Sequence, residues 1–229
     1  MIDELVGQLV WGFISARDDL PAVEEAAQKG HLGGIWLLPT EMRSATDTAA
    51  LVNRLQMVSP QPLLVGVDAE AGMGLVMGTA TQLPTAMALG ATGNLDLVRD
   101  AALVTAAEAT ACGVNAVAAP VLDVNVNPDN PIINTRSFGG NPELVANMGV
   151  AFVEALQTLS SSGAPVLPIG KHIPGHGDTV QDSHLHLAAI DAGRERLDSV
   201  ELVPFRAAIA AHVPMLMTAH VAYPALDPT

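Results

Sequence analysis

Short apolar runs, each followed by a longer alanine-rich stretch, recur along the whole chain. The runs have the length of strands and the stretches carry apolar residues at helical spacing, which is typical of repeated strand–helix units. Six such units are predicted. The strands are expected at Leu9–Ile14, Gly34–Leu38, Leu63–Val67, Val114–Ala118, Val166–Gly170 and Met215–Thr218, and the helices at Pro21–Lys29, Thr46–Met57, Leu95–Cys112, Pro142–Leu159 and Leu197–Ala211.

This alternation predicts an α/β fold, a (β/α)8 TIM-type barrel of which about six βα units are present in this chain. Hydrophobic residues make up 49% of the chain and aromatics only 3%, which indicates a core of small aliphatic side chains between helices and buried parallel strands. A doubly wound open sheet has the same alternation but should carry a glycine-rich phosphate-binding turn. Gly72-Met73-Gly74 lacks the third glycine of that turn, and no Walker sequence occurs.

Charge and hydropathy restrict the partners and the compartment. The net charge of -14 would repel a phosphate backbone, so we expect no nucleic-acid partner. Residues 71–95 carry no charge, but glycine, proline and threonine interrupt them, so no membrane-spanning helix is expected. The acidic Asp3 and Glu4 are unlike a secretory signal, which indicates a cytoplasmic protein, or an exported or lipoprotein form whose signal was removed. The single cysteine, Cys112, is expected in the core.

Polar residues gather directly after the predicted strands, in Asp68-Ala69-Glu70, Asp123–Arg136, Lys171–His184 and at His220. The loops that follow the strands of a TIM-type barrel form its catalytic face. The segment Lys171–His186 holds four His, two Asp and one Lys in sixteen residues. This density favours a functional site over a solvated loop.

Within that segment, Asp182 stands two residues before His184. The carboxylate could orient the imidazole as a general acid/base, and an Asx turn beside a spectator histidine fits the spacing equally well. A zinc or manganese site is the rival interpretation, but no His-Glu-x-x-His helix is present, so neither metal nor cofactor is expected. Its candidate ligands would be His172, His176, Asp178, Asp182, His184 and His186.

The sequence KHIPGHGDTVQDSH at 171–184 resembles the signature of family 3 glycoside hydrolases of the bacterial β-N-acetylglucosaminidase (β-hexosaminidase) type. That signature reads Lys-His-Phe-Pro-Gly-His-Gly followed by Asp-Ser-His, and Ile173 replaces its Phe. Further segments are similar to the family in the same order: GVDAEAG at 66–72, LPTAMALGAT at 83–92, NTRSFGGNPELVA at 134–146, ELVPFRAAI at 201–209 and MTAHVAYPALDP at 217–228. The resemblance covers residues 1–229 as the family's N-terminal (β/α) barrel domain.

The resemblance implies a retaining hydrolase that removes terminal β-linked N-acetylglucosamine in cell-wall recycling or amino-sugar scavenging. The partner would be an N-acetylglucosamine-containing glycan or muropeptide. His184 would be the acid/base and Asp182 its dyad partner, whereas the sugar would bind Asp68, Arg136, Lys171 and His172. Purely structural roles are the alternative: Arg136 could pair with Asp129 or Glu143, and Lys171 could neutralise Asp68.

The chain departs from the family pattern in two respects. The family's nucleophile, an Asp at the end of the seventh strand, is expected beyond residue 229, and Val76 and Met73 stand where the family has arginines. We therefore expect a fragment, a barrel completed by an oligomeric or swapped partner, or a catalytically inactive sugar-binding barrel. Phosphorolysis is a further alternative, because a neutral His acid/base would repel phosphate less than a carboxylate would.

Overall fold

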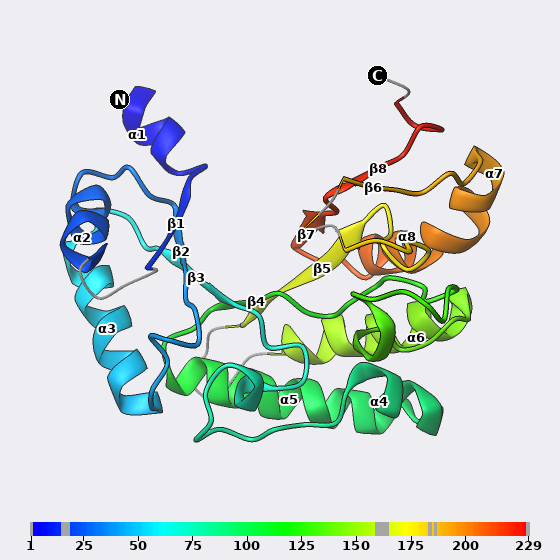
Figure 1. The fold of residues 1–229 in the computed structure, drawn as a ribbon. Helices are drawn as coiled ribbons and strands as arrows, with labels where there is room; N and C mark the ends of the chain where they lie inside the picture. Colours follow the sequence, from blue (N-terminus) through cyan, green and yellow to red (C-terminus); the bar gives the residue numbers. More distant parts are fainter. Residues whose placement is uncertain (1, 15–18, 159–164, 183–184, 186, 228–229) are drawn as a thin grey trace. The chain divides into compact units, whose positions relative to one another are not determined.

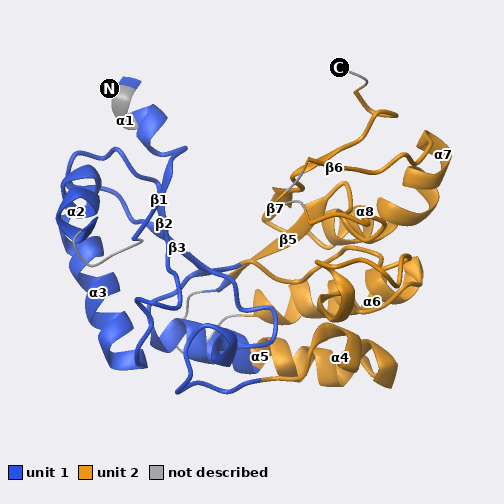
Figure 2. Ribbon diagram, viewed as in Figure 1, with its two compact units in different colours: residues 1–82, 104–117, 159–166 blue, residues 83–103, 118–158, 167–229 orange. Residues whose placement is uncertain are grey.

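The computed structural model describes residues 2–14, 19–158, 165–182, 185 and 187–227. The chain divides into two compact units (Figure 2). Residues 1–82, 104–117 and 159–166 belong to unit 1, and residues 83–103, 118–158 and 167–229 belong to unit 2. Helix α5 (Leu95–Ala111) therefore begins in unit 2 and ends in unit 1.

Unit 1 is built on parallel strands that pair in chain order (Figure 1). They are β1 (Trp11–Phe13), β2 (Gly34–Trp36), β3 (Leu64–Val67) and β4 (Ala116–Val117). Besides the last part of α5, unit 1 contains the helices α1 (Ile2–Gly7), α2 (Leu20–Gln28) and α3 (Ala45–Val58) and the 3-10 turn η2 (Met73–Leu75). Helix α3 begins at Ser44, whose hydroxyl accepts the N–H of Asp47, a regular N-cap.

Two glycines make room for the two tryptophans of the chain. The rings of Trp11 and Trp36 lie 5.9 Å apart between centroids, tilted at 51°. A Cβ atom on Gly34 would stand 2.6 Å from the Trp11 ring, and one on Gly66 would stand 2.7 Å from both rings. Glycine is therefore required on β2 and β3 by the aromatic side chains that cover these strands.

Unit 2 contains two pairs of parallel strands. Strand β5 (Leu167–Ile173) pairs with β7 (Met215–Thr218), and β6 (Ala188–Ala189) pairs with β8 (Val221–Ala222). The helical elements are α4 (Ala86–Thr92), η3 (Asn134–Arg136), α6 (Pro142–Leu156), α7 (Arg194–Arg196), the π-helical turn η4 (Leu197–Glu201) and α8 (Val203–Ala210). Leu122 packs against Phe205 and Ala208 in the core, where Gly149 of α6 and Gly170 of β5 approach it closely.

The predicted strands and helices are all present, with three informative differences. Strand β5 continues beyond the predicted end at Gly170 to Ile173, so Lys171 and His172 belong to the strand. The predicted helix Leu197–Ala211 is interrupted, because Pro204 has no N–H for a regular helical ladder and η4 precedes α8. The helix expected over Pro142–Leu159 ends at Leu156, and its predicted last residue lies outside the described part of the chain.

The core has the composition that the sequence predicts. Small aliphatic residues dominate it, and Cys112 is fully buried. Helices α1, α4 and α7 and strands β6 and β8 were not predicted; each is short. Within the described residues, no helix combines the length and the hydropathy needed to cross a membrane.

Candidate active site

The carboxyl end of strand β5 carries Lys171 and His172. Lys171 is 1% exposed, and its backbone is held on both sides: its N–H donates to the Pro120 carbonyl at 3.2 Å, and its carbonyl accepts from the Leu122 N–H at 2.6 Å. The Lys171–His172 peptide bond is cis. The start of the signature segment is therefore bound to the residues that follow β4.

A fully buried carboxylate, Asp123, holds His172. Asp123 Oδ2 lies 2.7 Å from His172 Nδ1, and Oδ1 accepts the backbone N–H of His172 at 3.3 Å and of His176 at 2.7 Å. A carboxylate only accepts hydrogen bonds, so Nδ1 of His172 carries the proton and donates it. Asp123 thereby fixes both the tautomer and the orientation of the His172 ring.

Asp123 lies in a polar segment that the sequence predicted to be at the catalytic face, but it was not singled out. The available signal was an acidic residue directly after the apolar run that contains β4. A charged residue at 0% exposure requires a partner. His172, 49 residues further along, provides it.

His176 is buried, whereas His172 is partly buried, and the two ring centroids lie 5.9 Å apart. Burial lowers the pKa of His176, and the charges of His172 and Arg136 act in the same direction, against its backbone hydrogen bond and the charge of Asp123. The side chain of Asn130 fixes this position by donating to the His176 carbonyl at 2.8 Å. His176 is accordingly held in a site that favours its neutral form.

Arg136 and Tyr223 lie within electrostatic reach of these groups. Arg136 is the last residue of η3 and is half-buried, and its Nη1 donates to the Ile132 carbonyl at 3.1 Å. Tyr223 is buried, and among the described residues its hydroxyl has no hydrogen-bond partner. Burial raises the pKa of Tyr223, and the charges of Asp123 and Glu201 raise it further, so the phenol stays protonated. Tyr223 was not predicted as part of the site.

The remaining predicted residues are placed as follows. Asp182 is half-buried in unit 2, whereas His184 lies outside the described residues, as does His186. Asp68 follows β3 in unit 1 and is half-buried. Met73 and Val76, which replace the arginines of the family pattern, are buried at 0% and 7% exposure. In the described part of the chain, no group of three His, Cys, Asp or Glu side chains is arranged to hold a metal ion.

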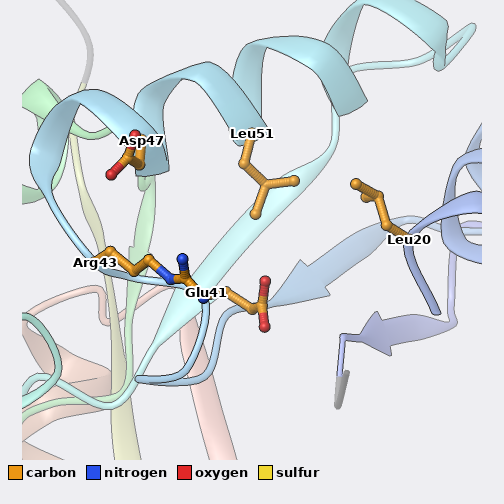
Figure 3. A pocket seen from close by; sticks show the side chains of 5 residues that line it. All are labelled: Leu20, Glu41, Arg43, Asp47 and Leu51. Atoms are coloured by element: carbon orange, nitrogen blue, oxygen red, sulfur yellow. The ribbon is translucent and has the colours of Figure 1, made fainter. Parts of the chain in front are cut away.

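Unit 1 also has a cavity of about 430 Å³, lined by Leu20, Glu41, Arg43, Asp47 and Leu51 (Figure 3). Its polar side chains carry both signs of charge, and Asp47 already hydrogen-bonds the Ser44 hydroxyl at 2.8 Å. None of the residues predicted to bind sugar or transfer protons lines this cavity. All of those residues except Asp68 belong to unit 2.

Comparisons with known proteins agree with the family resemblance. The model of the glycosyl hydrolase family 3 N terminal domain matches residues 1–229. The chain is 38% identical over 223 residues to a beta-N-acetylglucosaminidase/beta-glucosidase of Cellulomonas fimi, a match that covers 97% of this chain and 38% of that protein. The structure of a family 3 beta-N-acetylglucosaminidase from Paenibacillus sp. str. FPU-7 is 39% identical with a TM-score of 0.89, covering 100% of this chain and 44% of that one.

The structure of a beta-glucoside phosphorylase is also similar, at 27% identity and a TM-score of 0.88, and the match covers 100% of this chain and 40% of that one. The chain thus spans less than half the length of each of these three relatives. These matches confirm the predicted fold class, an α/β fold that is part of a TIM-type barrel. The chain belongs to the family of glycosyl hydrolase family 3 N-terminal domains.

Proposed function

We propose that the protein is a glycoside hydrolase that removes terminal β-linked N-acetylglucosamine by a retaining mechanism. The observation that carries this proposal is the 39% identity, over the whole chain, to a family 3 beta-N-acetylglucosaminidase. The substrate would be an N-acetylglucosamine-containing glycan or muropeptide. Its setting would be cell-wall recycling or amino-sugar scavenging.

In this proposal, Lys171, His172 and Arg136 of unit 2 bind sugar hydroxyl groups. A sugar-binding role is likewise proposed for Asp68, which follows β3 in unit 1. The buried carboxylate of Asp123 supports a binding role for His172, because it fixes the ring and the proton on Nδ1. Ordered charged groups make stronger hydrogen bonds to hydroxyls than neutral groups do. They also lose little entropy when the ligand binds.

His184 would transfer the proton, and Asp182 would orient the His184 imidazole. In a retaining glycosidase one group protonates the leaving oxygen and later accepts a proton from water, whereas a carboxylate attacks the anomeric carbon. An imidazole beside a carboxylate suits the first role near neutral pH. None of these residues would supply the attacking carboxylate.

The test is the turnover of 4-nitrophenyl β-N-acetylglucosaminide by the intact protein, with 4-nitrophenyl β-glucoside as the comparison substrate. We expect faster release of nitrophenol from the N-acetylglucosaminide. His184→Ala and Asp182→Asn should each lower kcat/KM about a hundredfold or more. Asp191→Asn, which changes an exposed carboxylate of the same part of the chain, should leave it unchanged.

Phosphorolysis is the second candidate, and the similarity to a beta-glucoside phosphorylase supports it. Adding inorganic phosphate and identifying the released sugar separates the two activities. Free N-acetylglucosamine at all phosphate concentrations supports hydrolysis, and the sugar 1-phosphate supports phosphorolysis. Binding of N-acetylglucosamine without any turnover would instead indicate a sugar-binding protein and overturn both enzymatic proposals.

A further inference from the structure

The guanidinium of Arg196 lies between two carboxylates of unit 2. Its Nη2 is 3.0 Å from Asp178 Oδ2 and 3.2 Å from Glu201 Oε1. Asp178 belongs to the signature segment that follows β5, whereas Glu201 ends the π-helical turn η4. One side chain therefore links the signature segment to the helical region that precedes α8.

Glu201 is the buried partner of Arg196 in this link. It is 1% exposed, and within the described residues neither of its carboxylate oxygens has a hydrogen-bond partner. A buried carboxylate is stable only beside a compensating charge, which Arg196 supplies. Glu201 also packs against the signature segment, because a Cβ on Gly175 would lie 3.0 Å from its Cβ. The Arg196 side chain is thus held by a group that itself cannot move into solvent.

Asp178 is four residues before Asp182, the carboxylate proposed to orient the proton-transferring His184. The backbone around Asp178 is anchored as well, because the Asn127 side chain donates to the Thr179 carbonyl at 3.4 Å. Beyond Thr179 the side chains of Val180, Leu185 and Leu187 are 71 to 81% exposed. The backbone is next held by strand pairing at β6, where Ala188 and Ala189 pair with β8. The contact with Arg196 therefore lies at the entry to the segment that carries Asp182.

We propose that Arg196 is a positioning residue for proton transfer: by binding Asp178 and Glu201 together, it fixes the start of the segment that carries Asp182. The inference rests on the proposed function, and it assigns a role to a residue that does not touch the substrate. Proton transfer depends on placement, since a misplacement of about 1 Å can cost a hundredfold in rate. An isolated exposed ion pair would be weak, but burial of Glu201 ties Arg196 to one place.

Leaving-group dependence tests this role directly. In an aryl N-acetylglucosaminide, a dinitrophenolate leaving group departs without being protonated. A phenolate leaving group must be protonated in order to depart. Arg196→Met should lower kcat/KM about tenfold or more for the phenyl substrate and hardly change it for the dinitrophenyl substrate. Arg196→Lys should restore part of the loss. The matched control is Arg194→Met, because Arg194 pairs with Asp198 on the surface at 3.3 Å.

Asp178→Asn provides a second variant that leaves Glu201 paired with Arg196, so it keeps the test valid if Arg196→Met fails to fold. It should reproduce the selective loss on the phenyl substrate. Equal losses on both substrates, or no difference from Arg194→Met, would overturn the proposal.

Amide hydrogen exchange over residues 179–187 gives a readout that does not depend on turnover. It should be faster in Arg196→Met and in Asp178→Asn than in Arg194→Met, and unchanged exchange would also overturn the proposal. Absence of turnover by the unsubstituted protein would count against the proposed function and leave the exchange comparison to decide the positioning role.

Discussion

The buried carboxylate of Asp123 pairs with the partly buried His172: its Oδ2 lies 2.7 Å from Nδ1, and its other oxygen accepts two backbone N–H groups. Those N–H groups belong to His172 and His176, so one carboxylate orients a ring and also sets the course of the backbone after β5. Such a double function makes Asp123 sensitive even to replacement by its amide.

Asp123→Asn should therefore impair sugar binding. The remaining amide oxygen can still accept backbone N–H groups, but the amide nitrogen would face the protonated Nδ1 of His172, and the ring would lose its orientation. Removing a carboxylate that orients a functional histidine commonly costs about 10–100-fold, and we expect kcat/KM on an aryl N-acetylglucosaminide to fall by that amount. The control is Asp129→Asn, an exposed position in the same segment. Equal kcat/KM values for the two variants would show that the pair does not support binding.

The lowered pKa of His176 predicts a specific acid sensitivity. Burial depresses the folded-state pKa below the ordinary value of 6.5, so the unfolded chain takes up a proton that the folded protein resists. The stability from this group is fully present above that value and is lost as the pH falls through it toward the folded pKa. In urea unfolding from about pH 7.5 to about pH 5, His176→Gln should lose less stability than the unsubstituted protein. His220→Gln, at an exposed position, should follow the unsubstituted curve.

Much of the fold could be predicted because its signals are local. Apolar runs predicted strands β1 to β5 and β7. A further local signal is Asn141 directly before Pro142 at the start of α6, where the Asn141 side chain accepts the Leu144 N–H at 2.9 Å. The two-residue strands β6 and β8 carry no such signal. They exist because residues 188–189 pair with residues 221–222, far apart in the sequence.

The candidate site was predictable only in part, because some of its residues are brought together from distant parts of the sequence. Lys171 and His172 stand in a dense cluster of functional residue types, which local composition reveals. Asp123 gains its role from a contact with His172 across 49 residues, and Tyr223 from burial near Asp123. Neither the contact of Asp123 with His172 nor the influence of the Asp123 charge on Tyr223 leaves a periodic pattern in the sequence.

Asn115→Ala should destabilise unit 1. The Asn115 side chain accepts the Val65 N–H at 2.7 Å and donates to the Leu63 carbonyl at 3.1 Å. These two hydrogen bonds connect Asn115 to the backbone of β3 and of the residue before it. The Leu63 carbonyl keeps the Gln56 side chain as a second donor, but the Val65 N–H would be left without its acceptor. An unsatisfied buried donor costs about 1–3 kcal/mol, which chemical denaturation would detect. Asn53→Ala, on the exposed side of α3, should change the free energy of unfolding by less than about 0.5 kcal/mol.

Gly177→Ala tests why the signature segment requires a glycine where it meets the residues after β4. A Cβ at this position would stand 1.8 Å from the Val124 carbonyl oxygen, a backbone atom that no change of side-chain conformation can remove. The backbone cannot easily retreat, because Asn127 N–H donates to the Gly177 carbonyl and Asp123 holds the adjacent His176 N–H. We expect a loss of about 1–3 kcal/mol in the free energy of unfolding.

The matched control is Gly78→Ala, at an exposed position where a Cβ would meet nothing within 4 Å. It should be neutral or slightly stabilising, since alanine restricts the unfolded chain more than glycine does. If both variants melted at the same temperature, the segments 123–127 and 175–178 would have to separate at little cost. The buried contact between Asp123 and His176 could then not be what holds the signature segment in place.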